Sequence, residues 1–372
     1  MTAQGQQIRF CTTHDGVRLA YATTGTGAPL VRTANWLSNL EHEWANPIRR
    51  PTLEALSRHF SLLRYDQRGC GLSDRAVKKI SFEAWLDDLD TVVNAAGLRR
   101  FSLYGASQGC AISIAYAARH PEKVSHLILY GGYALGKLRR DLSNREIEEA
   151  LMLQKIIELG WGKESPEFRQ VFTTQFVPQA SADQQRAFDE FQRMSTSAEN
   201  VVRIVREFDE IDVRDLARKI RCPTLVLHAR HDGRVPFDEG LKMAALIPGA
   251  RFVTLESHNH LLLASDPAFP MFVDEVVRFP HEHTPIAVNP ASENSLTNLT
   301  AREQTVVELI AQGHENTRIA QTLGLSEKTI RNYVSSIMDK LQMTGRSQLI
   351  VFARESGYGY AAAQTVRRDA SP

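Results

Sequence analysis

The stretch FSLYGASQGC, residues 101–110, decides the fold. Its apolar first half predicts a strand over Phe101–Tyr104, and a helix is expected from Cys110. Between them lies Gly105-Ala106-Ser107-Gln108-Gly109, whose small residues suit a strand that turns abruptly into a helix and lifts a serine hydroxyl above the sheet. A helix N-terminus also favours negative charge that develops beside it. The stretch therefore predicts a nucleophilic Ser107 at the edge of a sheet.

Strands and helices are predicted to alternate on both sides of this turn. Segments such as Ser81–Ala96 and Ala111–Arg119 have a helical pattern. Between residues 134 and 218 the strands stop and the pattern is helical throughout, which we interpret as a lid. The later strands are almost entirely apolar, as is typical of parallel strands buried on both faces, and this indicates a mostly parallel, doubly wound α/β sheet. The predicted strands are Ile8–Thr13, Val17–Thr23, Leu30–Ala34, Leu62–Tyr65, Phe101–Tyr104, Val124–Tyr130, Thr224–His228 and Phe252–Leu255.

Partners for the serine follow later strands of the predicted sheet. A serine hydroxyl needs an adjacent base to take its proton, and the base needs an acid to orient it. Asp232 comes directly after the strand Thr224–His228, and His260 follows the strand Phe252–Leu255. The carboxyl ends of parallel strands meet at one edge, so we predict the catalytic set Ser107, Asp232 and His260. His258 remains the alternative base.

Three motifs resemble the α/β-hydrolase superfamily over residues 8–279. They are Asp66-x-Arg68-Gly69-x-Gly71-x-Ser73-Asp74, the run from Asp232 to Val235-Pro236, and His260 followed seven residues later by Pro267. The resemblance implies the α/β-hydrolase fold and the acid and base positions given above. It also implies that the backbone N–H groups of Trp36 and Gln108 form an oxyanion hole.

The loop before the oxyanion hole departs from the pattern of the superfamily. This chain has Ala34-Asn35-Trp36 where His-Gly is usual, although asparagine tolerates the left-handed backbone that such a loop needs. Losing one N–H donor would lower the rate by a factor on the order of 100. Two interpretations therefore stay open: a working serine hydrolase of the esterase or lactonase type, or a retained triad that only shapes a binding pocket.

The predicted lid is rich in aromatic side chains. They either line an apolar pocket for a hydrophobic small molecule or pack the lid helices on one another. His258-x-His260 and His281-Glu282-His283 lack a third ligand at useful spacing, so we expect no metal site and no cofactor. The lid aromatics are Trp161, Phe168, Phe172, Phe176, Phe188 and Phe191.

The last quarter of the chain has the pattern of a small helical domain. Thr300 and Glu303 form a capping box, a short helix spans Asn316–Leu323, and Ser326 caps the next helix. That helix turns apolar residues inward at spacings of four, three and four. Its other face carries long or hydrogen-bonding side chains, as expected of a helix that enters the major groove of DNA.

The order L-T-x-R-E, I-A-x-x-L-x-L-S-x-x-T-I and Arg346-Ser347 resembles the LuxR-type helix-turn-helix domain over about residues 296–357. The resemblance implies that Arg331, Asn332 and Ser335 face bases. It also implies phosphate contacts and binding to double-stranded DNA as a homodimer. A protein-binding helical bundle is the alternative. The implied phosphate contacts are Lys328, Thr329, Tyr333 and Lys340.

The whole chain fits a two-domain protein. It has 372 residues, a net charge of +1 and four widely spaced cysteines, so we expect reduced thiols and only a local basic patch. Neither a signal peptide nor a membrane span is expected, and the predicted location is cytoplasmic. The expected division is a hydrolase-like domain over 1–279, a linker over 280–295, the DNA-binding domain over 296–357 and a disordered tail over 358–372. These features predict a DNA-binding transcription regulator whose hydrolase-like domain senses a small apolar ester or lactone. The alternative is an active serine hydrolase with an accessory DNA-binding domain.

Overall fold

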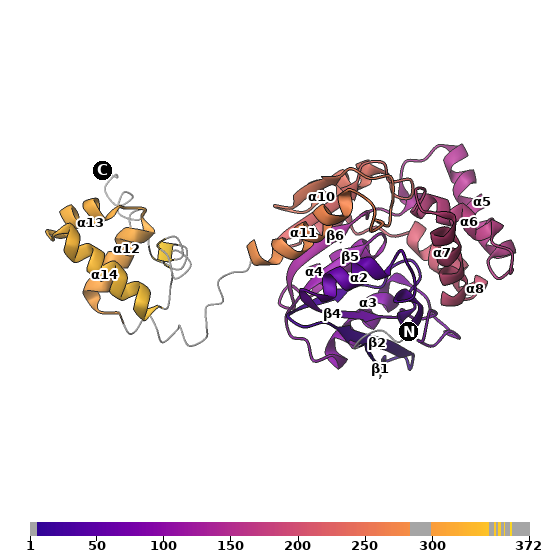
Figure 1. The fold of residues 1–372 in the computed structure, drawn as a ribbon, viewed down its shortest axis with the longest axis horizontal. Coiled ribbons are helices and arrows are strands. Elements are labelled where there is room, and N and C mark those ends of the chain that lie inside the picture. Colours follow the sequence, from indigo (N-terminus) through magenta and orange to yellow (C-terminus); the bar gives the residue numbers. More distant parts are fainter. Residues whose placement is uncertain are drawn as a thin grey trace, which may run out of the picture. The chain divides into compact units, whose positions relative to one another are not determined.

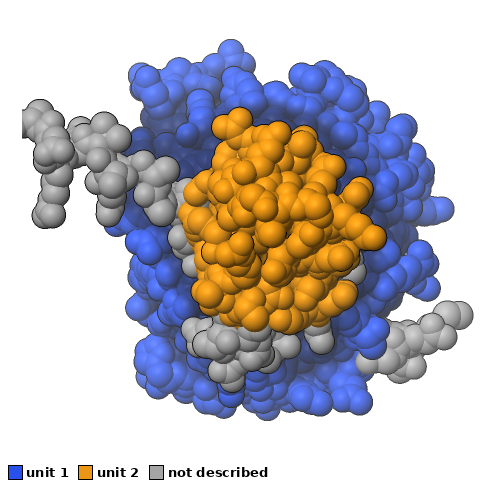
Figure 2. All heavy atoms as spheres, turned by 90° about the vertical axis from the view of Figure 1, so that its left-hand side faces the viewer, with its two compact units in different colours: residues 1–284 blue, residues 285–372 orange. Residues whose placement is uncertain are grey.

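The computed structural model describes residues 6–282 and 299–341, together with residues 346, 349, 350, 353 and 358. The chain divides into two compact units, Met1–Thr284 and Pro285–Pro372 (Figure 2). Each unit has a hydrophobic core of its own. Within the described residues, no helix is both long enough and apolar enough to cross a membrane.

The first unit is built on one sheet of eight strands in the order β1-β2-β4-β3-β5-β6-β7-β8. Figure 1 labels β1, β2, β4, β5 and β6 of this sheet. The pairs β1–β2 and β2–β4 are antiparallel, and the pairs from β4 through β8 are parallel. All six residues of β5 are buried, as a strand with helices on both faces requires. The strands are β1 Gln7–Thr12, β2 Arg18–Thr24, β3 Ala28–Arg32, β4 Phe60–Tyr65, β5 Phe101–Ala106, β6 Val124–Tyr130, β7 Thr224–Ala229 and β8 Arg251–Leu255.

Helices cover both faces of this sheet and confirm the doubly wound fold. Leu53 and Leu56 of α2 pack with Phe272 and Val276 of α11 in one core, on one face. Helices α3, α4 and α10 contribute to a second, larger core on the other face. The helices of these layers are α1 Leu40–Glu43, α2 Arg50–Ser57, α3 Phe82–Ala95, α4 Gly109–Arg119, α10 Phe237–Leu246 and α11 Ala268–Glu282.

Helices alone fill the chain between β6 and β7, where the sequence pattern predicts a lid. The face of α8 that carries Val201, Ile204, Val205 and Phe208 is buried, as the spacing of these residues predicts. Ser143 and Ser181 each begin a helix with a capping box. The elements are η1 Lys137–Arg139, α5 Asn144–Gly160, α6 Glu167–Phe176, α7 Ala182–Ser195, α8 Ala198–Asp209 and α9 Arg214–Ala217.

Helix α11 extends beyond the expected end of the hydrolase-like domain. We expected a linker from Pro280, but the helix continues through Pro280 to Glu282. Phe279 is buried in the core, and Arg278 holds Glu282 at 2.9 Å, so packing and an ion pair offset the loss of one N–H in the last turn. The rest of the expected linker, and the expected tail apart from Tyr358, lie outside the described residues.

Three helices of the second unit are described in full. They are α12 Ala301–Ala311, α13 Asn316–Leu323 and α14 Glu327–Lys340. The capping box between Thr300 and Glu303 is confirmed, and Ser326 caps α14. Gly324 ends α13 with a φ of 65°, in the left-handed region that favours glycine. The inward residues of all three helices form one core.

The D-x-R-G-x-G-x-S-D motif fixes loops of the first unit. The fully buried guanidinium of Arg68 forms a bidentate pair with Asp88 on α3 and a further ion pair with Asp15. The Asp66 carboxylate accepts from the N–H groups of Leu40 and Leu72. The motif therefore connects the loop after β4, and the turn between β1 and β2, to α3.

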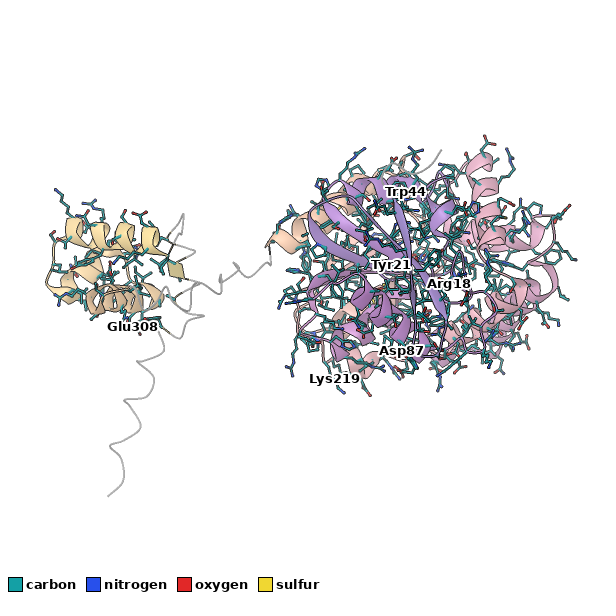
Figure 3. All side chains as sticks on the ribbon, turned by 90° about the horizontal axis from the view of Figure 1, so that it is seen from below. Arg18, Tyr21, Trp44, Asp87, Lys219 and Glu308 are labelled. Atoms are coloured by element: carbon teal, nitrogen blue, oxygen red, sulfur yellow. The ribbon has the colours of Figure 1, made fainter. Side chains whose placement is uncertain are left out.

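Replacement of Asp88 by alanine is expected to lower the free energy of unfolding of the first unit by about 3 kcal/mol, because it removes the buried carboxylate that pairs with Arg68 and leaves that charge with Asp15 and the Lys79 carbonyl. Asp87, its neighbour on α3, is exposed (Figure 3), so Asp87→Ala provides the control. All four tryptophans lie in the first unit, so their fluorescence during urea unfolding reports on that unit alone. Equal losses for the two variants would contradict the prediction.

Candidate functional site

Ser107 lies at a strained turn between β5 and α4. Its φ is 53°, which is unusual for a residue with a side chain, and such strain costs about 1–3 kcal/mol. The turn is held on both sides: the N–H of Ser107 donates to the carbonyl of Tyr130 at 2.9 Å, and its carbonyl accepts from Cys110. A Cβ on Gly105 would lie 2.5 Å from the Ser113 hydroxyl, so the turn requires glycine there.

The structure brings Asp232 and His260 together. Nδ1 of His260 lies 2.6 Å from Oδ2 of Asp232. The other carboxylate oxygen accepts from the N–H groups of Arg234 and Val235 at 2.8 and 2.9 Å. Burial works to raise the pKa of Asp232, but His260 and the Val235 N–H outweigh it and hold the pKa below its usual range. Asp232 is therefore a carboxylate that orients His260.

The alternative base, His258, lies elsewhere. Its side chain is exposed, and its ring stacks on His231 at a centroid distance of 4.4 Å. His260 is buried, and its carbonyl accepts from the Tyr130 hydroxyl at 2.8 Å. This geometry favours His260 over His258 as the partner of Asp232.

Two glycines that follow β6 separate the turn at Ser107 from the His260 loop. A Cβ on Gly131 would lie 3.3 Å from the His260 ring, and one on Gly132 would lie 2.7 Å from the Ser107 carbonyl. The Ser107 hydroxyl itself has no hydrogen-bond partner among the described residues. Catalytic hydrogen bonds are often long in ligand-free structures and shorten when substrate binds.

The predicted oxyanion loop is strained at a different residue than we expected. Trp36, not Asn35, has the left-handed backbone, with a φ of 43°. Three tertiary contacts hold it there: Gln67 donates to the Trp36 carbonyl at 2.7 Å, the indole N–H donates to Gln192, and the ring stacks on Phe172. Asn35 instead accepts from Arg32 at 3.0 Å. Gln108, whose backbone N–H is the second predicted donor of the oxyanion hole, directly precedes the first residue of α4.

The lid aromatics form a continuous stack that reaches from Trp36 to His260. Phe176 lies 5.7 Å from the Trp36 ring and 5.2 Å from the His260 ring, measured between centroids. Phe168 is half-buried, whereas the other five are buried. Much of this aromatic surface is therefore used in packing, and the stack forms an apolar cover beside the His260 ring. The buried aromatics are Trp161, Phe172, Phe176, Phe188 and Phe191.

Two groups of residues near the site were not predicted. The Arg234 guanidinium lies over the rings of Trp36 and Phe176, 5.8 and 5.6 Å from their centroids. Its position two residues after Asp232 was the available signal. Gly131 and Gly132 had a signal too, because paired glycines directly after a buried strand indicate a close backbone approach.

Cys110, close to the Ser107 turn, has a structural role. Cys110 is fully buried, burial raises the pKa of its thiol, and the thiol donates to the Gly105 carbonyl. Within residues 6–282 and 299–341, no three potential metal-binding side chains gather.

The predicted DNA-facing side chains of α14 divide into two sets. Lys328, Arg331, Asn332 and Ser335 are exposed and have no side-chain partner among the described residues. Thr329 contacts Ser326 in the helix cap, and Tyr333 packs against the core. The first set is free to contact a ligand from one helix face.

Lys340 has a structural partner. Its Nζ lies 2.8 Å from both carboxylate oxygens of Glu303, which is buried. The pair lowers the pKa of Glu303 to about 2, with help from the Thr300 cap. Lys340 therefore anchors the end of α14 to the start of α12, and its contact with phosphate stays a prediction.

Comparison with known proteins identifies both units. The family model described as alpha/beta hydrolase fold matches residues 39–267, and the model described as bacterial regulatory proteins, luxR family, matches residues 297–353. The chain therefore belongs to the α/β-hydrolase fold family, and it also carries a LuxR-family DNA-binding domain.

Similar proteins match the first unit. Pyrrolizixenacetamide deacetylase of Xenorhabdus hominickii is 26% identical over 256 residues, 67% of this chain and 90% of that protein. An AB hydrolase superfamily protein of Bacillus subtilis is 27% identical over 281 residues, 68% of this chain and 97% of its own. A solved esterase from Exiguobacterium antarcticum has the same fold, with a TM-score of 0.64 at 23% identity, over 73% of this chain and 99% of its own.

Replacement of Gly132 by alanine is expected to lower the free energy of unfolding by about 1–3 kcal/mol, because the new methyl would collide with Cys110 and the Ser107 carbonyl. Gly233→Ala is the matched control in the loop of Asp232, where the nearest atom would lie 3.8 Å away. Urea unfolding followed by tryptophan fluorescence measures both. A Gly132→Ala variant as stable as Gly233→Ala would show that the approach of Gly132 to Cys110 and the Ser107 carbonyl is not crowded.

Proposed function

We propose that this protein is a ligand-responsive transcription regulator. In this proposal the α/β-hydrolase unit, with its lid over residues 134–218, binds a small apolar ester or lactone. Ligand binding then changes how the LuxR-type unit engages double-stranded DNA. The observation that carries the proposal is one chain that joins the Asp232–His260 pair, covered by aromatic rings, to a helix with a free polar face.

The site supports a defined role for each residue. Ser107 would attack the carbonyl carbon of the ligand, while His260 takes the proton from the hydroxyl and Asp232 stabilises the resulting imidazolium. The backbone N–H groups of Trp36 and Gln108 would bind the oxygen that becomes negative. His260 would then return the proton to the departing alcohol oxygen, and water would release the acid from Ser107.

A second function is favoured by one specific contact. The 2.6 Å contact between His260 and Asp232 suits an active base, which supports a working serine hydrolase whose DNA-binding unit only localises it. The relative in Xenorhabdus hominickii is named a deacetylase, which also supports hydrolytic chemistry. Loss of regulation in a Ser107→Ala variant would favour chemistry, and retained regulation would favour binding alone.

Exposure of the full chain to a fluorophosphonate tests whether Ser107 is activated. We expect one covalent adduct on the wild type and none on Ser107→Ala, measured as intact mass. Asp232→Asn leaves the shape of the site but removes the charge that orients His260, so labelling should slow on the order of 10⁴-fold. Asp238→Asn, an exposed position on α10, is the control. If the wild type is not labelled, Ser107 is not activated, and the first unit would act only by binding its ligand.

The free face of α14 supports recognition of DNA through base edges. Arg331 and Asn332 are exposed one turn into the helix, after its Ser326 cap, where recognition helices contact bases. A domain of this size usually binds as a dimer across two half-sites, so we propose a homodimer on DNA. A ligand can shift DNA binding only through different affinities for the two states of the protein.

Substitution of Arg331 or Asn332 by alanine is expected to weaken specific binding by about 1–3 kcal/mol, which is about 5- to 150-fold. Footprinting on the DNA upstream of the protein's own gene would locate the site, and fluorescence anisotropy would give the affinity. Arg302→Ala, exposed on α12, controls for the loss of one positive charge. Undiminished affinity in both α14 variants would favour a protein-binding bundle.

A further inference from the structure

A small cavity lies close to the Ser107 turn, since Ala106, the residue before Ser107, is part of its lining. It is lined by residues of β3, α2, β5 and α11 and of the segment that follows His260, and it leaves about 50 Å³ for the centres of water molecules. Its polar wall consists of Arg32, Arg49, Thr52 and Tyr104, and its apolar lining includes Leu262 and Phe272. This space is sufficient for a few waters or one small organic molecule.

The polar wall has an excess of positive charge. Buried Glu43 is shared by Arg32, Arg64 and Arg49, whose nearest nitrogens lie 3.0, 2.6 and 3.6 Å from its carboxylate oxygens. Burial works to raise the pKa of Glu43, but these three arginines outweigh it and hold the pKa at about 2. Because one carboxylate pairs with three guanidinium groups, the cluster has an excess of positive charge. The charge of buried Asp66, which acts on Arg64, offsets this excess only in part, since burial raises the pKa of Asp66 to about 7.

Arg49 carries the unpaired edge of this cluster. Its side chain is only 5% exposed, and its ion pair with Glu43, through Nη1, is the longest of the three. Among the residues that the structure describes, neither Nε nor Nη2 has a hydrogen-bond partner. Those two N–H groups form the parallel pair of donors that a carboxylate accepts in bidentate fashion.

The unpaired edge is also held in place. The guanidinium of Arg49 lies over the Phe188 and Phe191 rings of α7, 5.8 and 5.0 Å from their centroids. Burial and the nearby charge of Arg32 lower the pKa of Arg49 to about 10, against the pull of Glu43, so it stays charged at neutral pH. A buried, charged and fixed donor pair without an acceptor is costly unless a ligand pairs with it.

We propose that this cavity is a binding site for the carboxylate of a short-chain organic acid, with Arg49 as its bidentate ligand. Acetate and propionate match the size of the space, and their alkyl ends suit the wall of Leu262 and Phe272. The site borders the aromatic stack through Arg49, which lies over Phe188 and Phe191, and the proposal does not depend on the function proposed above.

A bound acid would touch the loops that carry the catalytic residues. Asn35 precedes Trp36, Ala106 precedes Ser107, and Leu261 follows His260, and all three line the cavity. Because Arg49 also contacts α7, the acid would connect these loops to a lid helix. Occupancy of the cavity therefore stabilises the whole first unit, which gives the site a readout besides activity.

Thermal unfolding of the full chain tests the site. At equal ionic strength, sodium acetate or propionate should raise the Tm of the wild type in a saturable way, by about 2–4 °C well above the Kd. Sodium 2-(N-morpholino)ethanesulfonate, whose anion exceeds the cavity, should not. Arg49→Met should abolish the shift, and Arg50→Met, exposed on the same helix, should retain it. Thr52→Val, on the cavity wall, should weaken it.

Three results would overturn the proposal: no saturable shift in the wild type, an equal shift in Arg49→Met, or an equal shift with chloride. If Arg49→Met does not fold, a crystal structure of the wild type grown in acetate decides the question. Density for a planar group that bridges Nε and Nη2 of Arg49 supports the site, and density for ordered water there refutes it.

Discussion

The left-handed backbone of Ser107 is the constraint on which the first unit depends. It requires a close crossing of β5, α4 and the end of β6, and the chain meets that requirement with residues that lack side chains. Gly105 faces the Ser113 hydroxyl, and Gly132 faces Cys110, in each case with no room for a methyl group. The fully buried Cys110 then fills the space between the strands. The geometry of the candidate site and the packing of the core are therefore one arrangement here, and a change to either disturbs the other.

Buried charges position the loops around this crossing. Arg68 binds Asp88 and Asp15, while its neighbour Gln67 donates to the Trp36 carbonyl. The motif that contains them is thus a structural clamp on the loop of Trp36. The cluster around Glu43 differs, because it holds more positive than negative charge. The Arg68 network has two carboxylates for one guanidinium, whereas the Glu43 cluster has three guanidinium groups for one paired carboxylate and leaves Arg49 with unpaired donors among the described residues.

The sequence predicted those features that local chain chemistry determines. The turn at Ser107, the parallel sheet, the Thr300 capping box and the order of Asp232 and His260 follow from residues that are adjacent along the chain or follow successive strands. Features that depend on distant contacts were missed. The strain at Trp36 depends on Gln67 and Gln192, 31 and 156 residues away. Lys340 pairs with Glu303 across 37 residues. Pro280 stays helical because the core holds Phe279.

Strain at Ser107 bears on the choice between a receptor and an enzyme. A residue with a Cβ at a φ of 53° costs about 1–3 kcal/mol that glycine would avoid at the same position. At Trp36 packing offsets this cost, because the indole contacts the rings of the lid stack. At Ser107 the side chain is a small hydroxyl without a hydrogen-bond partner among the described residues, so it contributes little to packing. Packing alone therefore does not account for the strain at Ser107, and this is the observation that supports the proposed hydrolysis over binding alone.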